Sequence, residues 1–360
     1  MNVAAVRRLA LLRAFPAPRP LGQAMAASGF VQADPIRAPA RAQDLILRHR
    51  VPGYRAGDLE RRYPRLGLEE GFLHAYGFLP AAQHRLLLPR HHPEAPDGRF
   101  VPTGLLADVL AFVRQHGATH PAALEAHLGA AREVNAWGGV SKATTRALDM
   151  LLHHGLLRVV RREAGIRVFQ ATALASPHDL APLARLERLV LLVAGTLAPV
   201  AATTLVAATG RLVRSVLGPA ARHDAVAALL RSGALEAGTV DGVRYLWPAE
   251  ADRPGRVGGG VRFLAPFDPL VWDRRRFEHL WGWPYRFEAY TPPAQRRLGY
   301  YAMPLLRGAE VIGWVNCTRG AGRLDVAAGF VGRAPRDIPF RRAFDAEVAR
   351  LEAFLGTPQA

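Results

Sequence analysis

The chain has very little cysteine and lysine. Its 360 residues include one cysteine, Cys317, and one lysine, Lys142, although lysine and arginine together number 47. A single cysteine forms neither an internal disulfide nor a cysteine-based metal site, which excludes a disulfide-stapled secreted domain and fits a reducing cytoplasm. A single lysine leaves one side-chain amine for any reaction that proceeds through a Schiff base.

Acidic residues are also few relative to basic ones. Against 47 basic residues stand 30 acidic ones, so the net charge is +17. A GC-rich coding sequence would favour arginine over lysine, but it would not produce the net charge. Because the arginines are spread along the chain rather than collected on one amphipathic helix, we expect a polyanionic partner, with nucleic acid favoured over a membrane surface.

Only one uncharged segment is long enough to be considered as a membrane span. Residues 189–210, "LVLLVAGTLAPVAATTLVAATG", carry no charge over a length that could cross a bilayer. Pro199 and the many small residues instead favour two short buried helices with a break at the proline. The arginine-rich residues 1–20 are predicted to form a first helix, with an import peptide as the alternative. We expect a cytoplasmic protein, associated with the bacterial nucleoid.

Two segments resemble each other at an offset of about 78 residues. Residues 147–171 and 224–248 both read as the end of a helix, a glycine, a strand, a turn and a second strand. Two shorter helical patterns precede each copy. Three helices followed by a two-stranded wing are typical of the winged variant of helix-turn-helix. The sequence therefore predicts tandem winged helices in an α+β, mainly helical chain.

The length allows several domains around these repeats. We expect a helical or winged-helix-like region over residues 1–100, winged helices over 101–175 and 180–250, and a β-rich region with a closing helix over 255–360. Strand-like runs such as "YYAMPLL" and "EVIGWVNC" predict a small antiparallel sheet or barrel in the last region.

The short motif "VQADPI" places Gln32 and Asp34 two residues apart. Pro35 disfavours helical geometry for Asp34, and in an extended chain alternate side chains share a face, with Cα atoms roughly 6.5 Å apart. An amide and a carboxylate on one face can hold and aim a water molecule. The alternative interpretation is that Asp34 caps a helix beginning at Pro35 and that Gln32 is merely exposed.

The stretch "GFVQADPIRAPARAQDLILRHRVPGY" resembles the motif region of the tandem winged-helix DNA glycosylases, the AlkZ and YcaQ (AlkX) family of crosslink-repair enzymes. In that family a glutamine, an apolar residue and then glutamine or aspartate supply the catalytic pair, which implies a Gln-x-Asp version with Gln32 and Asp34 as catalytic residues. A second region of some fifty residues, from "APFDPLVWDRRRFEHLW" onward, is similar to the family's C-terminal signature. Where the family has a "YWAH" type segment, "EGFLHAYGFLP" keeps the histidine as His74 and replaces the tryptophan by Phe72.

The resemblance implies hydrolysis of the N-glycosidic bond of alkylated, cationic purines, including crosslinked guanines in double-stranded DNA. A carboxylate stabilises the oxocarbenium-like sugar and accepts a proton from water, which the glutamine orients. Strand-cutting glycosylases need an amine nucleophile, and Lys142 is the only lysine, so we expect a monofunctional enzyme. We also expect the protein to be a monomer.

The run "WDRRR" predicts a phosphate clamp of three arginines, with an Asp273-capped helix bearing surface arginines as the alternative. Trp272, Asp273 and His74 are expected as neighbours of the active site. The residues expected to bind DNA are Arg274, Arg275, Arg276, Lys142, Arg296 and Arg297.

No metal or other cofactor is expected. His116 and His120 are four residues apart, but Gly117 and Pro121 interrupt the helix that would align them. The competing function is a winged-helix transcriptional regulator without catalytic activity, because tandem winged helices alone are typical of DNA-binding regulators.

Overall fold

The structure is a computed structural model that describes residues 1–90, 100–129, 131–134, 140–173, 179–214, 221–249, 257–319 and 324–356. The chain forms two compact units. The first combines Met1–Leu59, Val193–Ala207 and Leu229–Ala360, and the second combines Glu60–Leu192 and Ala208–Ala228. Both units join segments that are far apart in sequence. The predicted domain boundaries near residues 175 and 250 lie outside the described residues.

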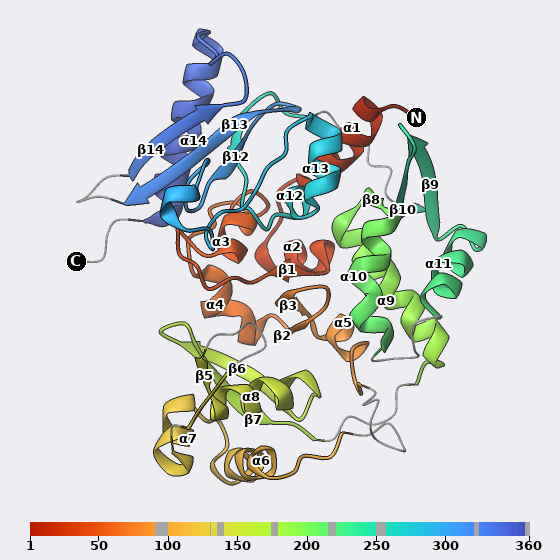
Figure 1. Ribbon diagram of the computed structural model, residues 1–360, viewed down its shortest axis with the longest axis vertical. Helices are drawn as coiled ribbons and strands as arrows, with labels where there is room; N and C mark the ends of the chain where they lie inside the picture. The colour runs from red at the N-terminus through yellow and green to blue at the C-terminus, as the bar shows by residue number, and fades with distance from the viewer. Residues whose placement is uncertain are drawn as a thin grey trace. The chain divides into compact units, whose positions relative to one another are not determined.

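Helices predominate, and the strand pairs within each unit are antiparallel, as the predicted α+β class requires (Figure 1). The helices of the first unit are α1 (Val3–Ala14), α2 (Leu21–Ser28), α3 (Ala42–Leu47), α12 (Pro269–Trp272), α13 (Arg274–Trp281), the short helix η3 (Pro293–Gln295) and α14 (Ile338–Leu355). Those of the second unit are η1 (Tyr63–Arg65), α5 (Ala81–Arg85), α6 (Leu105–His116), α7 (Pro121–Leu128) and α8 (Ala143–His153). Helices whose residues belong to both units are α4 (Asp58–Arg62), α9 (Pro182–Leu197), α10 (Ala202–Arg214) and α11 (Ala221–Arg231).

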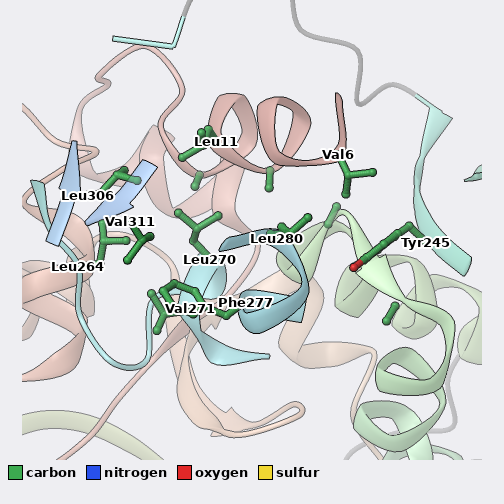
Figure 2. Packing of buried hydrophobic residues seen from close by; sticks show 14 of the residues in the cluster. Val6, Leu11, Tyr245, Leu264, Leu270, Val271, Phe277, Leu280, Leu306 and Val311 are labelled. Atoms are coloured by element: carbon green, nitrogen blue, oxygen red, sulfur yellow. The ribbon is translucent and has the colours of Figure 1, made fainter. Parts of the chain in front are cut away.

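The core of the first unit joins the two ends of the chain (Figure 2). Val6 and Leu11 of α1 are buried with Leu270 of α12 and Phe277 of α13. Outside this core, Arg7 donates from Nη2 to the carbonyl of Leu280 at 2.6 Å and so ties α1 to α13. The N-terminal helix therefore completes the C-terminal region.

A four-stranded antiparallel sheet carries this C-terminal region. Its strands, in spatial order, are β11 (Val261–Phe263), β12 (Met303–Arg307), β13 (Glu310–Arg319) and β14 (Leu324–Phe330). Among the described strands, β11 and β14 are unpaired edges, so the predicted sheet is confirmed and does not close into a barrel. The predicted closing helix is α14, whose Glu347 accepts a hydrogen bond from the backbone N–H of Phe263 at 3.0 Å.

The two related segments both contain the predicted hairpin. The first has β6 (Leu157–Glu163) paired with β7 (Ile166–Ala171), and the second has β9 (Leu235–Val240) paired with β10 (Val243–Pro248). Each two-residue turn has positive φ at both positions, at 164–165 and 241–242, which is the type I′ geometry that suits a twisted hairpin.

Further similarities link the two copies. Gly155 and Gly233 both have φ of 74° at the end of a helix, where the sequence predicts a left-handed residue. In each copy a short segment between the first two helices pairs with the second hairpin strand: Thr119 bridges Phe169, and β8 (Val200–Ala201) pairs with β10. The order of three helices and a hairpin thus occurs twice. At the same place a further segment pairs with the hairpin, as an isolated bridge in the first copy and as the strand β8 in the second.

The uncharged stretch from 189 to 210 is interrupted as predicted. Helix α9 ends at Leu197, β8 follows, and α10 begins at Ala202. In the described part of the chain, no helix has both the length and the apolar character needed to cross a membrane.

Four further strands form two hairpins in the second unit. These are β2 (Leu68–Phe72) with β3 (Tyr76–Pro80), and β4 (Arg132–Val134) with β5 (Val140–Lys142). In the first of them the carboxylate of Glu70, which is buried, accepts hydrogen bonds from Arg162 of β6 and from Tyr76. This ion pair fixes the hairpin against the first of the two related segments.

Candidate active site

Gln32 and Asp34 lie at the end of a short buried strand, β1 (Val31–Gln32). Gly29, with φ of 68°, ends α2 and turns the chain so that Phe30 and Val31 enter the core. No helix begins at Pro35, because the next helix, α3, begins at Ala42. The interpretation of Asp34 as a helix cap is therefore wrong, and the extended geometry predicted for Gln32 is confirmed.

The Asp34 carboxylate is fixed by its own backbone turn. Its Oδ1 accepts a hydrogen bond from the N–H of Ile36 at 2.9 Å, and the Asp34 N–H donates to Oε1 of the buried Gln43 at 3.4 Å. Among the residues that the structure describes, Oδ2 has no hydrogen-bond partner and no cation pairs with the carboxylate. One oxygen thus holds the side chain in place while the other is available for a reaction partner.

Burial shifts the acidity of this group. Loss of solvation raises the pKa of Asp34 above its ordinary value, and the hydrogen bond from Ile36 opposes the shift only in part. A desolvated carboxylate without a compensating cation is unfavourable for folding, and such groups concentrate at functional sites.

The amide of Gln32 is similarly unsatisfied. Gln32 is half-buried, and its Oε1 is a buried acceptor with no hydrogen-bond partner in the described part of the chain. Leaving such an acceptor unpaired costs about 1–3 kcal/mol, which a bound water or ligand recovers. Two residues apart, the motif therefore offers an unpaired amide oxygen and an unpaired carboxylate oxygen.

Three neighbours of this motif, two tyrosines and one arginine, were not predicted from the sequence. After burial, the second cause that raises the pKa of Tyr290 and of Tyr301 is the negative charge of Asp34, so both hydroxyls lie within electrostatic reach of the carboxylate. The Tyr301 hydroxyl is also buried without a hydrogen-bond partner among the described residues. Arg37 is exposed three residues after Asp34 and has no acidic partner among them. Of these three neighbours, only Arg37 could have been found from the sequence, because it is three residues from Asp34.

The three arginines of "WDRRR" do not form a joint surface. Arg276 is 2% exposed, and its guanidinium donates to the carbonyls of Leu197, Pro199, Pro269 and Leu270. Arg274 is half-buried, donates to the carbonyls of Val271 and Pro266, and stacks over the ring of Tyr285 at 4.6 Å. Burial lowers the pKa of both groups. The predicted clamp of three arginines is therefore corrected to a single exposed residue, Arg275.

Asp273 has the structural role of the alternative interpretation. It is the N-cap of α13, where Oδ1 accepts from the N–H of Arg276 at 3.1 Å and Oδ2 accepts from the hydroxyl of Thr204 at 2.6 Å. Both oxygens are occupied in this way, and the side chain is buried. Trp272 ends α12 and is half-buried.

Arg296 and Arg297 lie on the loop that follows α13. Arg296 donates from Nε to the carbonyl of Thr291 at 2.8 Å and lies 5.0 Å from the ring centre of Tyr300. The side chain of Arg297 is exposed, and among the described residues it has no acidic partner.

Lys142 and His74 belong to the second unit, whereas Gln32 and Asp34 belong to the first. Lys142 is the N-cap residue of α8, and its ammonium pairs with Glu125 of α7 at 2.5 Å. His74 lies in the turn between β2 and β3, and burial lowers its pKa to about 3, so the ring is neutral at physiological pH. Their predicted roles in DNA binding and in the active site stay predictions.

Comparison with known proteins identifies the family and the fold of the chain. Residues 25–354 match the family described as DNA glycosylase AlkZ-like. The fold is similar to that of Streptomyces sahachiroi DNA glycosylase AlkZ, with a TM-score of 0.60 and 15% sequence identity over 98% of this chain and 96% of that one. The family match includes the Gln32 and Asp34 motif and the whole C-terminal sheet. This chain therefore belongs to the AlkZ-like family of DNA glycosylases.

Proposed function

We propose that the protein hydrolyses the N-glycosidic bond of alkylated, cationic purines in double-stranded DNA, crosslinked guanines included, with Gln32 and Asp34 as the catalytic pair. The observation that carries the proposal is the Asp34 carboxylate. It is desolvated, has no cationic partner among the described residues, and stands two residues from an unpaired amide oxygen in a chain of the AlkZ-like family.

The geometry supports a dissociative hydrolysis. A purine alkylated on a ring nitrogen is a good leaving group, so positive charge develops on the sugar before water attacks. A fixed carboxylate in a partly desolvated site stabilises that charge, and its unpaired oxygen accepts the proton of the attacking water. The Gln32 oxygen accepts a hydrogen bond from the same water and orients it.

A water nucleophile also agrees with the scarcity of amines. Lys142 is the only lysine of the chain, and its amino group already contacts the carboxylate of Glu125. We therefore propose a monofunctional reaction that leaves an intact abasic site.

We propose that the two repeats of helices and a hairpin bind DNA as winged helices, together with exposed arginines of the first unit. The wing arginines of the first repeat are paired with acids, since Arg167 contacts Asp149 at 2.7 Å and Arg158 contacts Glu69 at 2.6 Å. Arg37, Arg275 and Arg297 are exposed and have no such partner among the described residues. These three are the stronger candidates for phosphate contacts.

The test is a product analysis. Purified protein is incubated with a duplex that carries one 7-methylguanine, and in parallel with a nitrogen-mustard crosslinked duplex. We expect free methylated base and a strand that breaks only after heat or alkali, with no covalent protein–DNA adduct after borohydride. Borohydride trapping would contradict the monofunctional mechanism, and an uncleaved glycosidic bond in both duplexes would contradict the proposed activity.

The competing function is a transcriptional regulator. Such a protein binds one sequence orders of magnitude more tightly than random DNA. No observation on the structure favours it over the glycosylase, because regulation gives no reason to keep a desolvated carboxylate unpaired.

A further inference from the structure

The loop of residues 283–302, between α13 and β12, carries two exposed aromatic rings. Tyr290 is 78% exposed and Tyr300 is 44% exposed. In the described part of the chain they are the two exposed side chains among the phenylalanines, tyrosines and tryptophans. Burying such rings gives a large favourable free energy, so their exposure on an ordered loop requires an explanation.

The loop is held in one shape by a buried carboxylate. Glu288, 7% exposed, accepts three backbone hydrogen bonds, from the N–H groups of Arg297, Leu298 and Gly299 at 2.9, 2.8 and 3.2 Å. Asn316 of β13 donates to the carbonyl of Leu298 at 2.7 Å. It also packs so closely that a Cβ on Gly299 would lie 2.4 Å from its Oδ1. The two tyrosines are therefore presented by a fixed scaffold.

The two rings differ in what already covers them. The guanidinium of Arg296 lies 5.0 Å from the ring centre of Tyr300, so one face of that ring holds a cation. Tyr290 meets the edge of Phe287, at 6.1 Å and 78°, and Phe287 in turn packs on the buried Tyr301 at 5.3 Å. Tyr290 thus rests on the core through Phe287 and keeps its ring accessible.

The loop is also positively charged. Arg286 precedes Tyr290, and Arg297 lies between Tyr290 and Tyr300 in sequence. Both arginines are exposed and have no acidic partner among the described residues. Aromatic rings on the same loop as unpaired guanidinium groups form the combination that stacks on bases and holds the adjoining phosphates. A protein-binding apolar patch would not need these free charges.

The Asp34 charge reaches this loop. It contributes to the raised pKa of Tyr290 and of Tyr301, after burial in both cases, so both hydroxyls lie within electrostatic reach of the carboxylate. Tyr290 belongs to the same compact unit as Asp34, and its exposed ring contacts Phe287, which packs on Tyr301.

We infer that Tyr290 stacks on the alkylated purine and contributes to the selection of damaged bases. The inference rests on the proposed function. An alkylated purine is a planar cation, and an electron-rich phenol face attracts a planar cation more strongly than a neutral base. The open ring, the fixed loop and the neighbouring carboxylate together favour a cationic base over an undamaged one.

The test is a binding experiment that does not require turnover. The probes are two duplexes, one with a 2′-fluoro-substituted 7-methylguanine nucleotide, whose sugar resists glycosidic hydrolysis, and one with guanine at the same place. Dissociation constants are measured for wild type, Tyr290→Ala, Tyr290→Phe and the control Ile338→Ala, which changes a residue 59% exposed at the start of α14.

We expect wild type to prefer the methylated duplex. Tyr290→Ala should lose about 5- to 100-fold of that preference, the range of one base stacking on an aromatic ring, while binding of the guanine duplex changes less than twofold. Tyr290→Phe and Ile338→Ala should keep the preference. Equal loss of affinity for both duplexes would show that Tyr290 contacts undamaged DNA and would overturn the inference, as would an unchanged preference in Tyr290→Ala or no preference in wild type.

Excision by wild type of ordinary 7-methylguanine is measured in the same series. If wild type excises 7-methylguanine but Tyr290→Ala keeps the preference for the methylated duplex, this inference is contradicted and the proposed function stays intact. If wild type does not excise 7-methylguanine but Tyr290→Ala loses the preference for the methylated duplex, the proposed chemistry is contradicted and the contact between Tyr290 and the base is supported.

Discussion

At the scale of single residues, Asp34 combines two properties that folding alone does not explain. Its carboxylate is partly desolvated, which raises its pKa, and it is not neutralised by a cation among the described residues. A raised carboxyl pKa means that the folded state binds the proton more tightly than the unfolded chain does. Ionised Asp34 therefore lowers the free energy of unfolding at neutral pH, so stability does not explain why a carboxylate is present at this position.

The first prediction concerns pH. If ionised Asp34 stabilises the sugar cation, the single-turnover excision rate should rise with pH as Asp34 loses its proton, with a midpoint above the ordinary aspartate value because burial raises this pKa. The measurement is the rate on 7-methylguanine duplex from acidic to neutral pH, corrected for spontaneous depurination. The Asp34→Asn variant should lack this rise, and a rate that is flat through the acidic range in wild type would contradict the assignment.

The second prediction concerns Gln32. Gln32→Ala removes the amide that orients water but keeps the charge, so we expect a loss of about 10- to 100-fold in single-turnover rate, the size of a positioning effect. Because the Gln32 oxygen is buried and unpaired among the described residues, its removal should not lower the melting temperature. A variant that loses activity only in proportion to its loss of folded protein would argue against a role in orienting water.

Part of this site was readable from the sequence. Pro35 and the two-residue spacing predicted that Gln32 and Asp34 lie on extended chain, and β1 confirms this for Gln32. The tyrosines near Asp34 were not predicted, because they are more than 250 residues away in sequence and no local pattern encodes that approach.

At the scale of elements, α13 shows why a run of like residues is a weak guide to a surface. Consecutive residues of a helix point about 100° apart, so Arg274, Arg275 and Arg276 cannot share one face. Arg276 points inward because the break at Pro199 exposes carbonyls that need donors. The sequence predicted the break at Pro199 and allowed the Asp273 cap only as the alternative to a clamp. It did not reveal that Arg276 joins the two.

The third prediction compares two neighbouring arginines. Arg276→Ala removes a buried guanidinium from several backbone carbonyls, so we expect the free energy of unfolding to fall by about 3–5 kcal/mol. Arg275→Ala changes an exposed side chain and should alter it by less than about 0.5 kcal/mol. Urea denaturation of both variants makes the comparison.

DNA binding should show the opposite order. Arg275→Ala should weaken binding and reduce the slope of log K against log salt by about 1, as loss of one phosphate contact does. Folded Arg276→Ala should keep the wild-type slope. If Arg276→Ala were as stable as wild type and bound DNA poorly, the predicted clamp would be right and the correction wrong.

At the scale of the whole molecule, local sequence patterns were sufficient to predict the two repeats. They were insufficient to predict which distant segments associate in the two compact units. Glycines at helix ends and in turns, such as Gly155 and Gly233, predicted both hairpins because each has a backbone requirement within a few residues. The association of α1 with α12 and α13 depends on apolar surfaces that are compatible with many partners, and only the folded core selects among them.

The fourth prediction concerns the net charge of +17. A repair enzyme must inspect any sequence, so we expect affinities for unrelated undamaged duplexes to agree within a few-fold and to fall steeply as salt increases from 50 to 200 mM. Fluorescence anisotropy with several random duplexes at both salt concentrations provides the test. One duplex bound orders of magnitude more tightly than the others would favour the transcriptional regulator.

The central claim is that Asp34 supplies the charge that breaks the glycosidic bond, and Asp34→Asn tests it most directly. The substitution preserves shape, removes the charge, and should not lower the melting temperature, since it relieves a desolvated carboxylate. Single-turnover excision of 7-methylguanine by wild type and Asp34→Asn is measured at equal folded fractions and saturating protein. We predict a loss of about 100- to 1000-fold, the size of a preorganised electrostatic contact, with DNA affinity retained. A rate within threefold of wild type would contradict the account.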